Sequence, residues 1–330
     1  MHTRNNYRNR NSNNTTLSSF TSATRAFNYS KNGITLFAKM NGKLKLSNGS
    51  SIRTWYFGNG FNNNRPWAGP IIEATEGEKV NITLYSMMPH SIHLHGLDVD
   101  QVNDGVPATS GYVGRSMRMM NFGRVDGYKS LGSSYTYTFI APKAGTYQYH
   151  CHVDTVLHYD MGMHGTIIIR PRSGNSTEAW DGGPKFDKEY VWQMGTFDSS
   201  WHNQRISGTG TVRYRPNHFL INGLNGSYAQ RDSTVVIKAN EADRVLVRLN
   251  QTSYQSALIE FDGLEFEVIA ADGRPANELQ KVRSLYIAPG ERYDVLLTMP
   301  DKGTYSPRVS YYDNKGINII GEVSTKLISF

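Results

Sequence analysis

Short apolar runs recur along the chain from about residue 31 to its end, and Gly, Pro, Asn or Ser bounds each of them. Examples are "GPIIEATEGEKVNITLYS", "SSYTYTFIAPKAGTYQYHCH" and "MHGTIIIRP". Runs of about four to eight residues between turn residues are typical of the strands of a β-sandwich. A chain of 330 residues is long enough for two such domains, each with its own core. We therefore predict an all-β protein built from two tandem β-sandwich domains.

Composition along the chain suggests where these domains begin and end. Residues 1–30 are polar and rich in Asn and Arg, and we expect a disordered tail there. The first sandwich is predicted over residues 31–170, a linker over 171–187, and the second sandwich over 188–330. The segments "ATEGEKVNITL" and "KANEADRVLVRL" resemble each other, which indicates two domains of one kind.

Charge and hydropathy argue against a nucleic-acid partner and against a membrane-spanning segment. The formal net charge of +7 lies partly in the N-terminal tail, and no motif combines aromatic and basic residues as nucleic-acid binding requires. No apolar run approaches the ~18 residues that would span a bilayer. We therefore expect neither a nucleic-acid partner nor a membrane span.

Three histidines lie close together in "MPHSIHLHG". Residues two apart in a strand share one face, whereas residues three apart do not. His93 and His95 are therefore expected to point the same way, and His90 the other way if the strand extends back to it.

The same alternation applies to "YHCH", which contains the only cysteine of the chain. His150 and His152 share a face, and Cys151 projects from the opposite one. Pairing this strand with the first histidine strand predicts two ligand sets. One set holds Cys151 and His90, and the other holds four imidazoles: His93, His95, His150 and His152.

Downstream, "HYDMGM" supplies His158 and Met163 on a loop that could fold back over Cys151. Two histidines, one thiolate and a weak axial methionine form the ligand set of a blue-copper electron-transfer centre. A single cysteine suits this role, because a second thiol could compete for the metal or become oxidised. Zinc is the competing metal, but structural zinc sites usually close with four Cys or His ligands from tight knuckles.

These motifs resemble those of a known family. "HSIHLHG" resembles the HPxHLHG-type motif of laccase-type multicopper oxidases, and "HCHVDTVLHYDMGM" resembles their HCHxxxHxxxxM motif. "GLDVDQVNDGVP" is similar to the acidic loop in the amino-terminal domain of copper-resistance oxidases. "LIEFDGLEFEVIAADG" and "APGERYDVLL" look like the copper-free middle domain of three-domain laccases. The resemblance covers roughly residues 50–330, and it implies two tandem cupredoxin-like Greek-key β-sandwich domains, the first of which holds copper.

The resemblance also implies a role for each motif residue. The expected ligands of type 1 copper, which takes electrons from the substrate, are His90, Cys151, His158 and Met163. The expected ligands of the type 2 and type 3 copper ions are His93, His95, His150 and His152. Cys151 would pass electrons to its two histidine neighbours. Asp104 matches the family's acidic residue near the copper cluster and would orient water or relay protons, although an Asp-Gly turn is the alternative.

The sequence departs from the family pattern in three ways. Five residues separate His152 from His158, where laccases usually have three, so Met161 could replace Met163 as the axial ligand. The blue-copper motifs lie in the first domain, whereas the family usually has them in its last. A complete trinuclear cluster of the family takes eight histidines, and this chain offers four in the right pattern.

Three arrangements would resolve the shortage of histidines. Two chains could share a cluster across an interface, or a further domain or subunit could supply the rest. The third arrangement is a single type 2 copper, as in copper nitrite reductases, although those enzymes have Asp at the place of His93 and no His at the place of His152.

The function favoured by these observations is a laccase-like oxidase in a homo-oligomer. It would couple one-electron oxidation of a phenol, an amine or a metal ion to the reduction of dioxygen. A nitrite reductase-like enzyme and a non-enzymatic blue-copper or assembly-forming protein remain alternatives. The resemblance implies an extracytoplasmic location, in the periplasm, at the cell surface or secreted, although no signal peptide is visible in the sequence.

Overall fold

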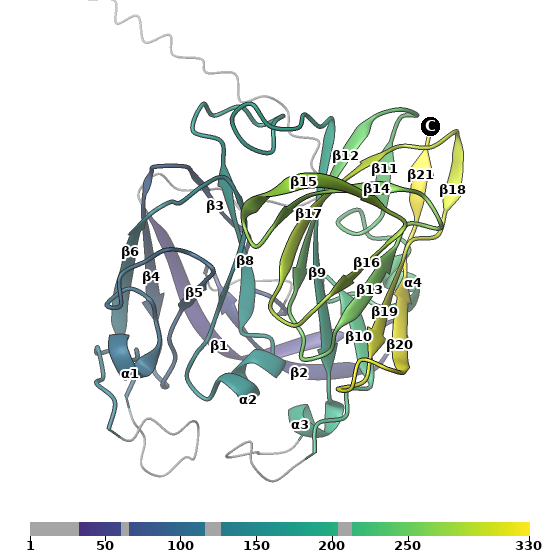
Figure 1. Cartoon of the computed structure of the whole chain (residues 1–330). Coiled ribbons are helices and arrows are strands. Elements are labelled where there is room, and N and C mark those ends of the chain that lie inside the picture. Colours follow the sequence, from purple (N-terminus) through teal and green to yellow (C-terminus); the bar gives the residue numbers. More distant parts are fainter. Residues whose placement is uncertain (1–32, 61–65, 116–126, 204–212) are drawn as a thin grey trace, which may run out of the picture.

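The computed structural model describes residues 33–60, 66–115, 127–203 and 213–330. The expected tail over residues 1–30 lies outside this range. The described residues form strands with a few short helices, and the all-β prediction is confirmed (Figure 1).

Two four-stranded sheets make up the first half of the described chain. One has the order β2-β1-β4-β6, and its strands are β1 (Ile34–Lys45), β2 (Ser51–Gly58), β4 (Lys79–Tyr85) and β6 (Ser134–Ile140). The other has the order β3-β8-β7-β5, and its strands are β3 (Ile72–Thr75), β5 (His93–His95), β7 (Gly145–His150) and β8 (His164–Arg170). Two short helices, α1 (Pro107–Ser110) and α2 (Thr155–Asp160), lie in the connections.

The second half contains a six-stranded, a four-stranded and a three-stranded sheet. The six-stranded sheet has the order β10-β9-β12-β17-β14-β15, formed by β9 (Lys188–Phe197), β10 (His218–Ile221), β12 (Arg244–Gln251), β14 (Phe266–Ala271), β15 (Arg274–Val282) and β17 (Arg292–Thr298). The four-stranded sheet has the order β16-β13-β19-β20, formed by β13 (Ala257–Glu260), β16 (Ser284–Ile287), β19 (Arg308–Tyr312) and β20 (Ile319–Ser324). The order β11-β21-β18 describes the smallest sheet, with β11 (Ile237–Ala239), β18 (Gly303–Tyr305) and β21 (Leu327–Ser329). Helices α3 (Ser199–Asn203) and α4 (Gly226–Ala229) complete the half.

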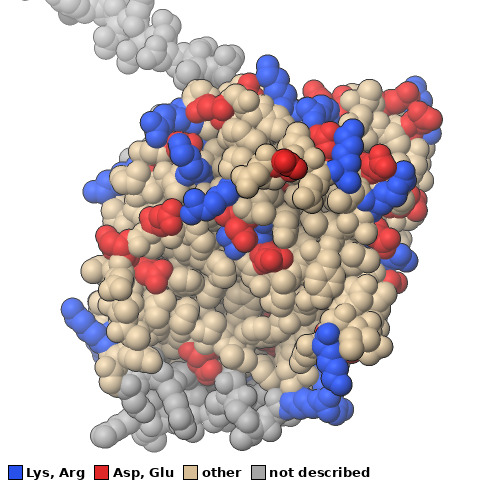
Figure 2. Space-filling model, viewed as in Figure 1, with Lys and Arg blue, Asp and Glu red and all other residues tan. Residues whose placement is uncertain are grey.

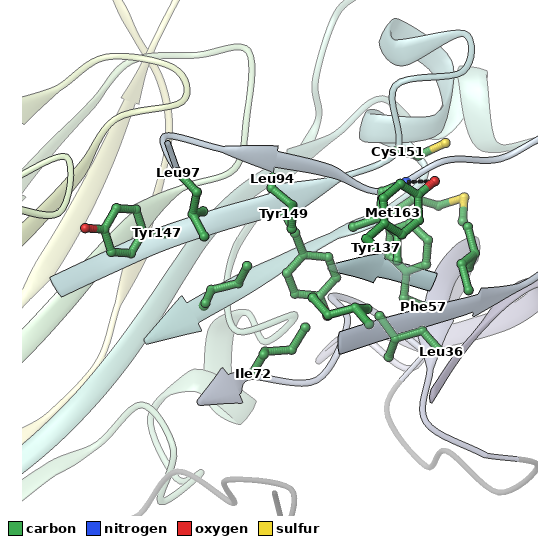
Figure 3. Close-up of a cluster of buried hydrophobic side chains, with 14 of the residues drawn as sticks. Leu36, Phe57, Ile72, Leu94, Leu97, Tyr137, Tyr147, Tyr149, Cys151 and Met163 are labelled. Atoms are coloured by element: carbon green, nitrogen blue, oxygen red, sulfur yellow. Dashed lines mark hydrogen bonds between the residues drawn. The ribbon is translucent and has the colours of Figure 1, made fainter. Parts of the chain in front are cut away.

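Strand β7 lies between β5 and β8 in its sheet, and all six of its residues are buried. Tyr147 and Tyr149 alternate along one face and pack with Cys151 in the core of the first half (Figure 3). The other face meets the second half, where the Thr146 hydroxyl donates to the Asp294 carboxylate at 2.5 Å. Polar Thr146, Gln148 and His150 alternate with Tyr147 and Tyr149 along the strand, and both faces are buried. This packing brings the end of β7 to the boundary between the halves.

A buried ionic network joins the two halves at this boundary. Arg170 on β8 contacts Glu189 on β9 with two hydrogen bonds of 2.7 and 2.8 Å. Arg248 on β12 is fully buried and bonds to Glu189 at 2.6 Å and to Asp294 at 2.9 Å. Burial would raise the pKa of Glu189, but the two guanidinium groups hold it at about 2. The network thus fixes β7 and β8 against the strands of the second half.

Charged side chains of both signs lie on the surface of the described residues. On the face shown in Figure 2, acidic and basic side chains are interspersed, and no broad area of one sign forms. None of the described helices is long and apolar enough to cross a membrane.

Candidate metal centre

Three side chains converge in a fully buried cluster, which we name the Cys151 cluster. It consists of His90, Cys151 and His158, whose ligand atoms all lie within 4.8 Å of one another. The Cys151 Sγ is 3.2 Å from Nδ1 of His158 and 3.7 Å from Nδ1 of His90. The two Nδ1 atoms are 3.1 Å apart. One thiol and two imidazole nitrogens thus face a common point.

Three separate segments supply these side chains. His90 precedes β5 and forms an isolated bridge with Val113, so it lies outside the strand that carries His93. Cys151 directly follows β7, and its amide donates to the Met163 carbonyl at 2.9 Å. His158 lies within α2. The structure therefore separates His90 from His93 and His95, although the strand that carries those two does not extend back to His90.

Helix α2 replaces the loop that we expected between His152 and His158. Residues 155–160 contain neither Gly nor Pro, and the helix begins after Asp154, which adopts a left-handed conformation with φ of 42°. The two extra residues relative to the family spacing are thus taken up in a helical turn. His158 still reaches the Cys151 cluster in spite of the longer connection.

Burial keeps the Cys151 cluster free of charge when no metal is bound. It lowers the pKa of His90 to about 3 and that of His158 well below its ordinary value. It also raises the pKa of the Cys151 thiol to about 12. The imidazoles are therefore neutral near pH 7 and have lone pairs for a metal, while the thiol must give up its proton on binding.

Packing around the cluster is aromatic and sulfur-rich. Trp55 on β2 lies edge-on to His158, with ring centroids 5.1 Å apart. Met161 and Met163 are both buried in the core that contains Cys151, and Figure 3 shows Met163 at the same end of this core as Cys151. Met163 is also linked to His158, because its amide donates to the His158 carbonyl at 3.0 Å. Backbone bonds thus connect Met163 to two members of the cluster.

A second group of ligands lies across β5 and β7, and we name it the histidine cluster. It consists of His93, His95 and His150, again with ligand atoms within 4.8 Å of one another. Strand pairing places His93 opposite His150, and Nδ1 of His95 is 3.3 Å from Nε2 of His150. His152 is not in this group of three, although its ring centroid lies 5.3 Å from that of His93. Among the described residues, these two clusters are the places where three potential metal ligands come together.

Asp104 lies directly behind the histidine cluster. The Nδ1 of His93 is 2.8 Å from the Asp104 carbonyl and 3.1 Å from its carboxylate. Both oxygens are acceptors, so Nδ1 carries the hydrogen and Nε2 is left for a metal. Carboxylates and carbonyls behind a metal-binding histidine fix its tautomer and its orientation in this way. Gly105 enforces the approach, because a Cβ there would lie 1.8 Å from the Ile92 carbonyl oxygen.

The second half also reaches the histidine cluster. Burial lowers the pKa of His95 to about 4, and the nearby Arg292 guanidinium and His93 lower it further. Arg292 begins β17 and donates to the Gly290 carbonyl at 2.6 Å. The sequence pattern gave no sign of Arg292 or Trp55 as neighbours of the clusters, because each is distant in sequence from the residues it contacts.

Three further described histidines belong to neither cluster. His164 and His202 are buried on β8 and α3, and His218 begins the edge strand β10. His202 contacts Asp160 at the end of α2, which the sequence did not suggest.

The donor sets fit copper. Thiolate with imidazole and thioether suits a redox-active copper ion, and imidazoles alone suit further copper ions. The Nε2 atoms of His90 and His158 have no hydrogen-bond partner among the described residues, so both rings are held by packing and are aimed through Nδ1. A metal at this point would satisfy all three converging donors.

Comparison with protein families gives two matches along the chain. One model described as "Multicopper oxidase" matches residues 37–173, and a second with the same description matches residues 196–325.

Curated relatives include nitrite reductases and laccases. The "Copper-containing nitrite reductase" of Neisseria gonorrhoeae is 25% identical over 80% of this chain and 60% of its own length. "Laccase-18" of Oryza sativa subsp. japonica is 28% identical over 71% of this chain and 37% of its own length. The chain therefore spans less than two thirds of either relative.

A solved structure shares both the fold and the length. The "Blue Copper Oxidase from Nitrosomonas europaea" superposes with a TM-score of 0.70 at 25% sequence identity. The match covers 90% of this chain and 85% of that one.

Proposed function

The chain belongs to the multicopper oxidase family, and we propose that it is a laccase-like oxidase with two cupredoxin-like domains. Its cofactor is copper. In this proposal, single electrons enter at the Cys151 cluster and leave at the histidine cluster, where dioxygen is reduced. The observation that carries the proposal is that Cys151 and His150 are consecutive residues whose side chains belong to different clusters.

At the Cys151 cluster the chain would hold a type 1 copper. His90, Cys151 and His158 would hold this copper, and Met163 would be a weaker ligand. Bound copper supplies reversible one-electron chemistry, while the protein fixes the ligand geometry and keeps water out. Complete burial of His90, Cys151 and His158 supports this division of roles.

At the histidine cluster the chain would hold type 2 and type 3 copper ions through His93, His95, His150 and His152. His93 and His95 are only half buried, so this cluster is open to solvent and dioxygen on one side. Asp104 would keep the His93 tautomer fixed, and its partly exposed carboxylate would orient water or relay protons. These are the tasks that dioxygen reduction places on the chain's own residues.

Four histidines are too few for a complete trinuclear cluster of the family. We propose that a second copy of the chain, or a further domain or subunit, supplies the remainder at the open side of the histidine cluster. Closed point-group symmetry is the usual route by which identical chains build such a shared site.

The test is oxygen consumption by the purified, copper-loaded protein with phenols, diamines and metal ions as reductants. The proposal predicts a strong visible absorption from the Cys151–copper bond together with oxygen uptake. Absence of both would refute it. Visible absorption without oxygen uptake would support the non-enzymatic electron carrier instead.

A nitrite reductase-like activity is the second candidate. The Neisseria gonorrhoeae relative supports it, and so does a histidine group of three, which is enough for a single type 2 copper. His93 speaks against it, because those enzymes have an aspartate there. Nitrite consumption under argon with a chemical reductant separates the candidates, since a dedicated oxidase leaves nitrite unchanged.

The domain division and the location of the protein remain part of the proposal. We place the domains at residues 31–170 and 188–330, joined by a linker over 171–187. An extracytoplasmic location would suit the family and the oxidising chemistry.

A further inference from the structure

Helix α3 belongs to the second half, yet its side chains enter the first half. Trp201 packs in the same core as Cys151 and Met163, and only 4% of its surface is exposed. His202 is fully buried and lies between β2 and the end of α2. A helix of the second half thus packs into the core that contains Cys151.

Hydrogen bonds at both ring nitrogens fix the orientation of the His202 side chain. Its Nδ1 faces the Arg53 carbonyl on β2 at 2.5 Å. Its Nε2 faces the Asp160 carboxylate at 3.0 Å and the Asp160 carbonyl at 3.1 Å. Both ring nitrogens of His202 are thus hydrogen-bonded inside the protein, one to β2 and the other to the end of α2.

Asp160 has a second hydrogen-bond partner, which comes from the second half of the chain, as His202 does. The Tyr214 hydroxyl donates to its other carboxylate oxygen at 2.6 Å, while Asp160 itself is only 3% exposed. Tyr214 is fixed in turn against the Thr196 hydroxyl at 3.1 Å. Both oxygens of a buried carboxylate are therefore held by groups beyond residue 195. We call Asp160, His202 and Tyr214 the Asp160 clamp.

The Asp160 clamp is connected to the metal ligands through the backbone. Asp160 ends α2, two residues after His158. The next turn is tied to β2, because the Trp55 amide donates to the Met161 carbonyl at 2.9 Å. It is tied back to the cluster through the bonds of Met163 with His158 and Cys151. A shift of Asp160 must therefore change the positions of His158 and Met163.

We propose that His202 is a positioning residue for the Cys151 cluster, which fixes α2 and so sets the ligand geometry of the copper bound there. The part that concerns copper rests on the proposed function. The potential of a blue-copper site depends on its axial ligand and on the bonds around its ligands. A residue of the second domain thus tunes the copper site of the first.

The test compares His202→Gln with His218→Gln as a matched control. His218 lies on β10 close to His202 and is partly exposed. It belongs neither to the Asp160 clamp nor to either candidate metal cluster. We expect His202→Gln to retain the copper but to shift its reduction equilibrium about tenfold, which is about 59 mV for a one-electron couple. The visible absorption band should move as well, and His218→Gln should change neither property.

Two further variants keep the test decisive if His202→Gln does not fold. Tyr214→Phe removes one hydroxyl from a partly exposed side chain and should shift the potential in a folded protein. Asp160→Asn removes the charge and keeps the shape. The shifts caused by Tyr214→Phe and Asp160→Asn should not add in the double variant, because both break the hydrogen bond between these two residues. Unchanged potentials in all folded variants, or fully additive shifts, would overturn the proposal.

A copper-free measurement separates this proposal from the proposed function. Hydrogen exchange of the amides of residues 154–163 should speed up in His202→Gln and Tyr214→Phe relative to the parent and to His218→Gln. If the parent shows no visible copper band, the proposed function fails, and exchange alone then decides whether the clamp holds α2. Equal exchange in all four proteins would refute the clamp.

Discussion

Cys151 and His150 are joined by one peptide bond, yet their side chains lie in two different clusters. The Sγ of Cys151 is 3.2 Å from Nδ1 of His158, and Nε2 of His150 is 3.3 Å from Nδ1 of His95. The His150 Nδ1 is 3.0 Å from the Cys151 carbonyl, so the imidazole is also bonded to the backbone of the cysteine. A short covalent and hydrogen-bonded path thus joins the Cys151 thiol to the histidine cluster, and under the proposed function electrons would take this path.

Replacement of the thiol should separate the two clusters. Cys151→Ser removes the soft ligand, so we expect loss of the visible absorption and of oxygen consumption. The histidine cluster should keep its copper, because none of its ligands changes. Copper analysis and absorption spectroscopy of the same preparation check both parts. Full oxygen uptake by the variant would contradict the proposed electron path.

Copper binding at the Cys151 cluster should depend on pH through one proton. The thiol, with a pKa of about 12, is protonated near pH 7, while His90, with a pKa of about 3, is neutral. Copper therefore displaces a proton from Cys151 and none from His90 or His158, and its affinity should rise about tenfold per pH unit between pH 6 and 8. Competition with a chelator of known affinity at three pH values measures the slope. An affinity independent of pH would show that copper binds without the thiolate.

Removal of the carboxylate behind His93 should affect one cluster only. Asp104→Ala leaves the Asp104 carbonyl bond to His93 but removes the carboxylate. Partners of this kind typically contribute about 10- to 100-fold to metal affinity or activity, and we expect a loss of oxygen consumption in that range. The visible band of the Cys151 cluster should stay the same, and it serves as the internal control. A changed band would mean that Asp104 acts on the fold as a whole.

The ionic network between the halves should contribute to stability through pairing. Arg248→Met leaves Glu189 and Asp294 buried with one cation fewer, and breaking a buried pair in this way costs roughly 3–5 kcal/mol. Chemical denaturation of the copper-free protein measures the loss. The exposed pair of Arg274 and Asp98 offers the control, since Arg274→Met should cost less than about 1 kcal/mol. Equal losses for the two variants would contradict a special role of the network.

Local patterns in the sequence were enough to predict the all-β fold, and they grouped the candidate ligands by strand face. Residue alternation works at β5 and β7 because side chains two apart share a face of any strand, whatever surrounds it. It placed His93 with His150 and separated both from Cys151, as the structure does.

Contacts between distant segments could not be predicted in this way. His202 meets Asp160 across 42 residues, and Trp55 meets His158 across more than twice that distance in the chain. No periodicity relates such residues, since their contact depends on how the two halves pack. Helix α2 was missed for a different reason, because a six-residue helix is too short to show a helical apolar pattern.

The most direct test of two linked copper sites is an electron paramagnetic resonance spectrum recorded together with the copper content per chain. The account predicts two copper species in the parent, of which the one with the narrow hyperfine splitting of a thiolate-bound ion disappears in Cys151→Ser. Two coppers per chain would fit a single type 2 ion, and two and a half a cluster shared between two chains. A single species at one copper per chain would contradict the account.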